Sequence, residues 1–113
     1  MKIYHNPRCT KSRQTLALIR EAGVEPEVIE YLKDPPSAAE LDRILKMLGI
    51  EPQALMRKGE KRYKELGLGR KPLSRKEAIR ILAENPVLIE RPIVVQGQTA
   101  VLGRPPENVS ALL

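Results

Sequence analysis

One short stretch near the start of the sequence carries residue types that are suited to nucleophilic chemistry. Residues 4–13 hold the only cysteine, Cys9, and the only histidine, His5, together with three cations and no acid. An apolar segment precedes the stretch and a helical pattern follows it, so Cys9 is expected at a strand-to-helix turn. Backbone N–H groups and the positive end of a helix dipole would then face the sulfur. With nearby cations they favour the thiolate, which is the nucleophilic form of cysteine.

Cys9 has a second interpretation as a buried structural thiol, because free cysteine often packs as a small hydrophobic residue. Its neighbours Arg8 and Thr10, with Lys11 and Arg13 close by, are not typical of a protein core. The sequence therefore favours a reactive thiolate.

His5 and Ser12 are the candidates to support this thiolate. His5 ends the predicted strand four residues before Cys9, where it could activate the sulfur, hold a water or serve as a turn residue bonded to backbone. Ser12 lies one helical turn after Cys9, and its hydroxyl can donate to the sulfur. The alternative for Ser12 is an ordinary residue of a helix start. A Cys-x-x-Ser turn would keep a thiolate without allowing an internal disulfide.

Composition and charge limit the classes of protein to consider. The chain has 113 residues, of which 42% are hydrophobic and 30% charged, as expected for one globular domain. No apolar run approaches the ~20 residues of a membrane span. One cysteine excludes an internal disulfide, and no signal-peptide pattern is visible, so a cytoplasmic protein is expected. A monomer without a bound metal or cofactor is also expected.

The net charge of +6 is compatible with an anionic partner. The cations are scattered, however, mostly with acids nearby. With three tyrosines and no Phe or Trp, no aromatic platform for single-stranded nucleic acid is visible. One cysteine and one histidine cannot form a zinc finger. We therefore expect a small oxyanion substrate in preference to nucleic acid or a membrane.

The sequence predicts an α/β fold in the order strand, helix, strand, several helices, strand, strand, helix. Two capping boxes, Ser37–Glu40 and Ser74–Glu77, mark helix starts in the middle of the chain. Apolar spacing predicts core faces of Leu41, Ile44, Leu45 and Leu48 after the first box, and of Ala78, Ile81 and Leu82 after the second. The predicted strands are residues 2–4, 26–31, 93–95 and 99–102, and the predicted helices are about 12–21, 37–48, one or two pieces within 51–68, 74–84, and one from about 105.

This order is typical of a thioredoxin-like, or glutaredoxin-like, fold with a mixed four-stranded sheet. We predict a single domain over residues 1–113, with a helical subdomain inserted at about 37–85. In that fold the reactive cysteine follows the first strand, where Cys9 lies, and a cis-proline before the third strand faces it. Pro92 could occupy that position and bring Arg91 near the sulfur; the alternative is a surface arginine. Spacing alone says little about Arg57 and Arg104.

The motifs of the whole chain resemble those of the glutaredoxin-type arsenate reductases of the ArsC family, and most closely their short chromosomal relatives. The resemblance covers nearly all of the sequence. It rests on residues 3–7 with Cys9 and Ser12, and on the segments 30–32, 35–36, 55–58, 63–68, 91–95 and 103–105.

This resemblance implies site residues and a reaction. The cysteine that attacks arsenate would be Cys9, and the arginines that bind the oxyanion would be Arg57, Arg91 and Arg104. His5 matches the histidine that lowers the cysteine pKa in the family, and Ser12 matches the serine that supports the thiolate. The implied partners are arsenate, glutathione as reducing co-substrate, and glutaredoxin.

Two other functions remain open from the sequence. Cys9 could serve a glutathione-dependent thiol oxidoreductase with a different substrate. The same fold also includes redox regulators that bind RNA polymerase; these usually carry a Cys-x-x-Cys pair, which Ser12 removes here.

Overall fold

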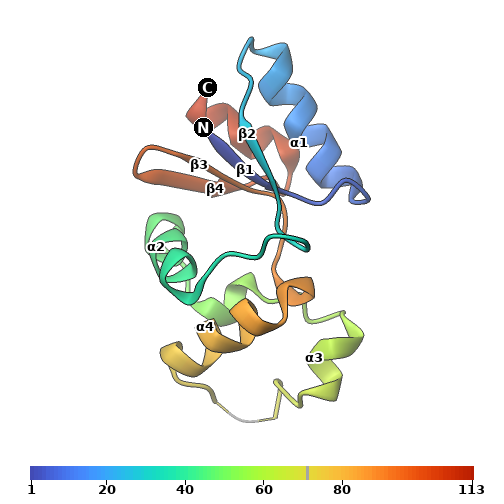
Figure 1. The fold of residues 1–113 in the computed structure, drawn as a ribbon, viewed down its shortest axis with the longest axis vertical. Helices are drawn as coiled ribbons and strands as arrows, with labels where there is room; N and C mark the ends of the chain where they lie inside the picture. The colour runs from blue at the N-terminus through green and yellow to red at the C-terminus, as the bar shows by residue number, and fades with distance from the viewer. Residues whose placement is uncertain (71) are drawn as a thin grey trace. The chain divides into compact units, whose positions relative to one another are not determined.

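In the computed structural model, which describes residues 1–70 and 72–113, four strands form one mixed sheet in the order β2-β1-β3-β4. The first two strands, β1 (Lys2–His5) and β2 (Glu27–Glu30), are parallel. The other two, β3 (Ile93–Gln96) and β4 (Thr99–Leu102), form an antiparallel hairpin whose first strand pairs with β1. The mixed sheet predicted from the sequence is therefore confirmed, with β1 in its interior (Figure 1).

Two helices cover one face of this sheet. They are α1 (Thr10–Glu21), which connects β1 to β2, and the 3-10 helix η3 (Pro106–Leu112). Their apolar side chains pack with those of β1 and β3 in a buried cluster, which holds α1 firmly on the sheet. The cluster consists of Ile3, Leu16, Ile19, Val94 and Val109.

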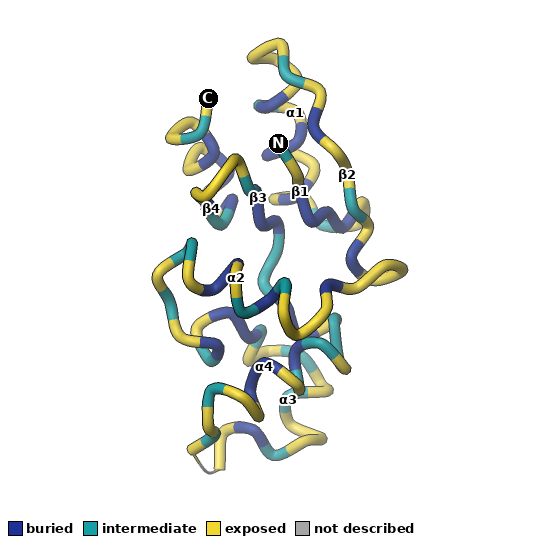
Figure 2. The backbone as a smooth tube through the Cα atoms, turned by 60° about the vertical axis from the view of Figure 1, so that its left-hand side comes forward, coloured by how far each residue is buried: buried dark blue, intermediate teal, exposed yellow. Residues whose placement is uncertain are grey.

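The chain divides into two compact units, and the sheet belongs to the unit made of residues 1–34 and 91–113. Residues 35–90 form the second unit, whose described part contains helices and one isolated β-bridge between Met56 and Ile89. Its longest helices, α2 (Ala38–Leu48) and α4 (Arg75–Glu84), pack together through buried residues, drawn in dark blue in Figure 2. The shorter elements are η1 (Pro52–Leu55), α3 (Lys61–Glu65) and η2 (Pro86–Leu88).

Both predicted capping residues begin their helices. Ser37 Oγ accepts from the N–H of Glu40, and Ser74 Oγ accepts from the N–H of Glu77, each at 3.1 Å. A serine at this position satisfies a backbone donor that the helix leaves free. Local sequence thus determines where α2 and α4 start.

Three predicted details are wrong. α1 begins at Thr10 instead of Ser12, because Cys9 itself is the residue before the first turn. The buried face of α4 contains Ile79, whereas Ile81 is only partly buried. Leu48, predicted in the core face of α2, is only partly buried. The predicted last helix is present and is of the 3-10 type.

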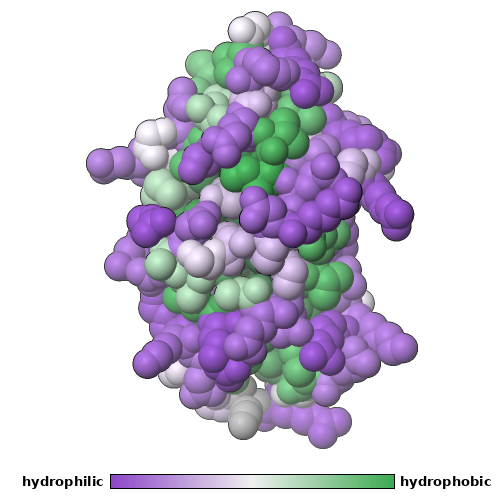
Figure 3. Space-filling view, viewed as in Figure 1, coloured by the Kyte–Doolittle hydropathy of each residue, from purple (hydrophilic) through white to green (hydrophobic). Residues whose placement is uncertain are grey.

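The face drawn in Figure 3 is mainly hydrophilic, with apolar side chains showing between charged ones. Within the described ranges, no helix combines the length and hydrophobicity needed to cross a membrane.

Candidate thiolate site

Cys9 lies immediately before α1 in a turn that backbone hydrogen bonds close. Its N–H donates to the carbonyl of Asn6 at 3.0 Å, and the Asn6 side-chain oxygen accepts from the N–H of Arg8 at 3.0 Å. The Arg13 guanidinium donates to the carbonyl of Pro7 at 3.0 Å. Cys9 has extended backbone angles (φ −92°, ψ 122°), as is usual for a residue that precedes a helix. The turn therefore presents the thiol to the free N–H groups of the first helical turn.

The pKa of the Cys9 thiol lies below its ordinary value. Partial burial of the sulfur acts to raise this pKa, but several donors outweigh it. The groups that lower the pKa are the backbone N–H of Ser12, the Arg91 guanidinium, which also adds its positive charge, and the backbone N–H of Lys11. These groups stabilise the negatively charged sulfur more than the neutral one. The sequence-based expectation of a thiolate at a helix start thus has a physical basis in the structure.

The Ser12 hydroxyl does not have the partner expected from the sequence. Ser12 is fully buried, and its Oγ lies 2.6 Å from His5 Nδ1 and accepts from the N–H of Asn6 at 3.0 Å. The hydroxyl therefore links the end of β1 to α1. Ser12 lowers the pKa of the thiol through its backbone N–H and not, as predicted, through its hydroxyl.

His5 is buried, and its pKa is lowered from the ordinary histidine value. Burial is the main cause; the carboxylate of Glu30, its partner on β2, opposes the shift, and Arg20 and Arg13 add to it. A neutral ring with its proton on Nε2 can accept a hydrogen bond from the Ser12 hydroxyl at Nδ1. This arrangement makes His5 a support for Ser12 instead of a positive charge beside the sulfur.

Arg91 and Arg104 lie at the same end of the sheet unit. Arg104 Nη1 donates to the Arg91 carbonyl at 3.3 Å, and the N–H of Gly103 donates to the Pro92 carbonyl at 2.9 Å. The Arg91–Pro92 peptide is cis, as the sequence allowed, and so is Arg104–Pro105. Of the two arginines, Arg91 is the one that lowers the pKa of the Cys9 thiol.

Arg57 belongs to the helical unit, where two carboxylates hold its side chain. Its Nε donates to Glu60 at 3.2 Å, and its Nη1 lies 3.7 Å from Glu90. The Arg57 side chain is 25% exposed, so these partners fix an arginine that is neither buried nor fully solvated. Its predicted role with the oxyanion remains a prediction.

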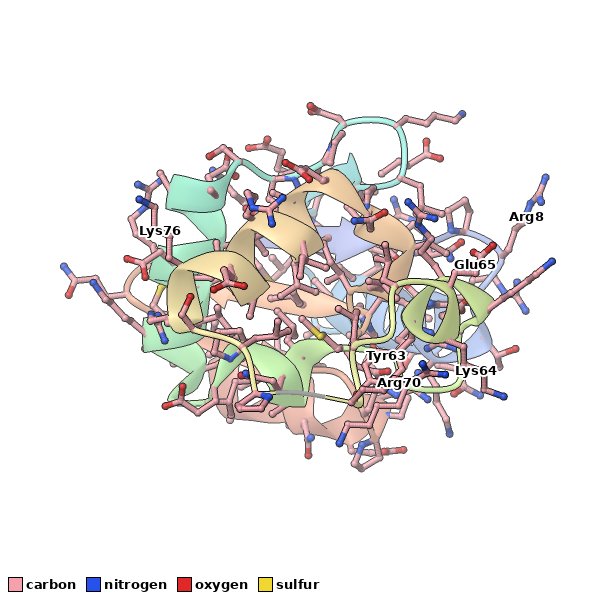
Figure 4. The ribbon with its side chains drawn as sticks, turned by 90° about the horizontal axis from the view of Figure 1, so that it is seen from below. Arg8, Tyr63, Lys64, Glu65, Arg70 and Lys76 are labelled. Carbon is pink, nitrogen blue, oxygen red and sulfur yellow. The ribbon has the colours of Figure 1, made fainter. Side chains whose placement is uncertain are left out.

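The cations next to Cys9 in the sequence are not the ones that contact its sulfur. Arg8 is exposed, and its side chain extends outward in Figure 4. Lys11 contributes through its backbone N–H, and Arg13 is bonded to the carbonyl of Pro7. The cation that matters, Arg91, comes from a segment far along the sequence.

Sequence reasoning missed Asn6 as a residue of the site. Its side chain and both of its backbone groups take part in the turn around Cys9. The Asn6-Pro7 dipeptide was the available signal, because asparagine before proline often starts a turn with its side chain bonded to the backbone. Thr15 and Gly103 gave no comparable signal.

A separate cleft of about 470 Å³ lies within the helical unit, along α4 and the segment that follows α3. It contains none of the predicted site residues. In Figure 4 the labelled side chains of Tyr63, Lys64 and Arg70 come from α3 and that segment. Over residues 1–70 and 72–113, no group of three or more His, Cys, Asp or Glu side chains could hold a metal ion.

The sheet order and the position of Cys9 at the start of α1 define a thioredoxin-like fold with a single activated thiol. Comparison with known proteins is more specific: the chain belongs to the ArsC family, whose sequence pattern matches residues 4–112.

Individual relatives are similar over nearly their full length. An arsenate reductase from Haemophilus influenzae is 46% identical, with 98% of this chain and 97% of that protein covered. The uncharacterised Escherichia coli protein YfgD is 54% identical, covering 96% of this chain and 92% of that protein. The structure of an arsenate reductase from Vibrio cholerae superposes with a TM-score of 0.95 at 51% identity, covering 100% of this chain and 98% of that one. These matches confirm the predicted family and fold class.

Proposed function

We propose that this protein reduces arsenate to arsenite, with Cys9 as the nucleophile and glutathione and glutaredoxin as the source of electrons. The observation that carries the proposal is the lowered pKa of the Cys9 thiol, caused by two backbone N–H groups and Arg91. The names of its relatives support arsenate as the substrate. We further propose that it acts in the reducing cytoplasm as a monomer without a bound cofactor.

The first step would join two negatively charged groups. The Cys9 thiolate attacks arsenic and forms an S–As bond, and one arsenate oxygen leaves as water after protonation. Arginine stays protonated and binds oxyanions through paired N–H groups, so it can offset this repulsion. We assign that role to Arg91 and Arg104 at the end of the sheet, and to Arg57 from the helical unit. The same cations would stabilise the charge that develops as the oxygen departs.

The second step reduces arsenic. A glutathione thiolate attacks Cys9 Sγ, an S–S bond forms, and the electron pair of the S–As bond passes to arsenic. Arsenic thereby goes from the pentavalent to the trivalent state and leaves as arsenite. Glutaredoxin then attacks the mixed disulfide and regenerates the Cys9 thiolate. Because Cys9 is the only cysteine, both electrons come from these outside thiols.

Arsenate-dependent oxidation of NADPH tests this proposal directly. The assay contains glutathione, glutaredoxin and glutathione reductase, and it compares the wild type with Cys9→Ser. Turnover that is lost in Cys9→Ser supports arsenate reduction at this thiol. Turnover at the level of Cys9→Ser would reject arsenate as the substrate. A glutathione-dependent reaction with another substrate would then be the next function to test.

A further inference from the structure

Thr15 is a buried polar residue that the proposed mechanism does not use. It lies on α1 and is 0% exposed. Its hydroxyl donates to the Lys11 carbonyl at 2.8 Å and lies 3.4 Å from the Gly103 carbonyl. The second contact spans 88 positions of sequence, so one hydroxyl lies near both the first turn of α1 and the residue that follows β4.

The Lys11 carbonyl belongs to a peptide group whose N–H acts on the Cys9 thiol. That peptide unit joins Lys11 to Ser12, so its other polar group is the Ser12 N–H, which lies in the first helical turn after Cys9 and helps to lower the pKa of the thiol. A donor on the carbonyl oxygen increases the polarity of the N–H in the same peptide, because hydrogen bonds in a chain strengthen one another. Thr15 is therefore one peptide group away from the thiolate.

The second neighbour of Thr15 leads to the arginines. A Cβ atom built on Gly103 would overlap Thr15 Oγ1 and lie 2.7 Å from Pro92 Cγ. The Gly103 N–H donates to the Pro92 carbonyl. Gly103 directly precedes Arg104, whose guanidinium donates to the Arg91 carbonyl. Thr15 thus packs between the helix start that holds Cys9 and the segments that carry both arginines.

We propose that Thr15 is a positioning residue for Cys9, whose hydroxyl aligns and polarises the Lys11–Ser12 peptide while its side chain fixes Gly103 against α1. This inference rests on the proposed role of Cys9 as a nucleophile. A bond from a threonine hydroxyl to the carbonyl four residues earlier is common in helices and by itself has no functional meaning. Three features distinguish the Thr15 bond from that common case. Thr15 is fully buried, its hydroxyl also lies near the Gly103 carbonyl, and the Lys11 carbonyl shares a peptide group with the Ser12 N–H.

The test measures the rate at which iodoacetamide alkylates Cys9 as a function of pH. The variant Thr15→Val keeps the shape of the side chain and removes the hydroxyl, and Thr15→Ser keeps the hydroxyl. Thr99→Val, at an exposed position of β4, is the control, because it makes the same chemical change away from the thiol. Thr15→Ala removes the hydroxyl without placing a methyl group against Gly103, and it replaces Thr15→Val if that variant does not fold.

We expect Thr15→Val to move the alkylation midpoint to higher pH and to slow alkylation near neutral pH about two- to fourfold. Thr15→Ser and Thr99→Val should keep the wild-type profile. A Thr15→Val profile equal to wild type, whatever its melting temperature, would overturn the proposal. So would equal shifts in Thr15→Val and Thr15→Ser, which would assign the effect to packing of the methyl group. A wild-type midpoint at the ordinary cysteine pKa would instead contradict the nucleophilic role of Cys9.

Discussion

Cys9 is stabilised as a thiolate by groups from opposite ends of the sequence. The backbone N–H groups of Lys11 and Ser12 are local, and any helix that starts at Thr10 would supply them. The Arg91 guanidinium depends on the tertiary fold, because β3 must pair with β1 to bring it close. Nucleophilicity at this site is therefore a property of the folded molecule.

Replacing Arg91 should make the thiol less acidic. We expect Arg91→Ala to slow alkylation of Cys9 near neutral pH by about three- to tenfold, because it removes both a charged hydrogen bond and a positive charge. Arg8→Ala is the matched control, since Arg8 adjoins Cys9 in sequence but its exposed side chain is not among the groups that lower the thiol pKa. Equal rates in Arg91→Ala and the wild type would remove Arg91 from the site.

His5 should make the stability of the protein depend on pH. Burial lowers its pKa below the value in the unfolded chain, so the unfolded state takes up the proton first as the pH falls. Stability that is present above the unfolded histidine pKa is consequently lost as the pH falls toward the native one. His5→Asn, whose side chain can still bond to Ser12, has no such titration.

Urea unfolding of both proteins at about pH 7.5 and 5.5 isolates this contribution. The wild type should lose more free energy of unfolding than His5→Asn between the two conditions. A larger loss in His5→Asn would mean that the native pKa of His5 is raised, contrary to the structure.

At the scale of elements, the sheet unit depends on one close approach between α1 and the chain after β4. Gly103 allows it, because a side chain there would meet Thr15 and Pro92. Close approach of two backbones is a common reason for a glycine that has no unusual φ angle.

Gly103→Ala should therefore destabilise the protein by about 1–3 kcal/mol, as overpacking of a tight contact does. Gly59→Ala is the control, because a Cβ atom there meets nothing within 4 Å and its φ angle is not positive. Denaturant titration of both variants compares them directly. Equal stability would show that α1 can move away from Gly103 at little cost.

These elements also show how far the sequence alone could lead. The starts of α2 and α4 were predictable because Ser37 and Ser74 act on backbone groups three residues away. The contact between Thr15 and Gly103 was not, because nothing in either local sequence indicates a partner 88 positions distant. For the same reason, local spacing could suggest that Cys9 is a thiolate, whereas Arg91 became a candidate partner only through the position of Pro92 in the expected fold.

At the scale of the whole molecule, the residues predicted to bind the oxyanion come from different parts of the sequence. Cys9, Arg91 and Arg104 belong to the sheet unit, whereas Arg57 belongs to the helical unit, where Glu60 and Glu90 hold its guanidinium. A guanidinium has five N–H donors, so those of Arg57 that do not contact the two carboxylates can still donate to a ligand.

Kinetics can separate Arg57 from the groups that act on the thiol. We expect Arg57→Ala to raise the KM for arsenate about tenfold or more, since a charged hydrogen bond to an oxyanion is lost. The pH profile of Cys9 alkylation should stay as in the wild type. An unchanged KM would exclude Arg57 from substrate binding, and a shifted alkylation profile would assign it to the thiol instead.

Because the sequence has one cysteine, chemical labelling of this protein reports on the proposed nucleophile alone. Any thiol-directed dye, spin label or mass tag will modify one atom in the chain, and that atom is the proposed nucleophile. Labelling yield then equals the fraction of accessible Cys9, with no background to subtract and no second site to mutate away. Screening for the physiological substrate could begin with compounds that protect this single position from a fluorescent label.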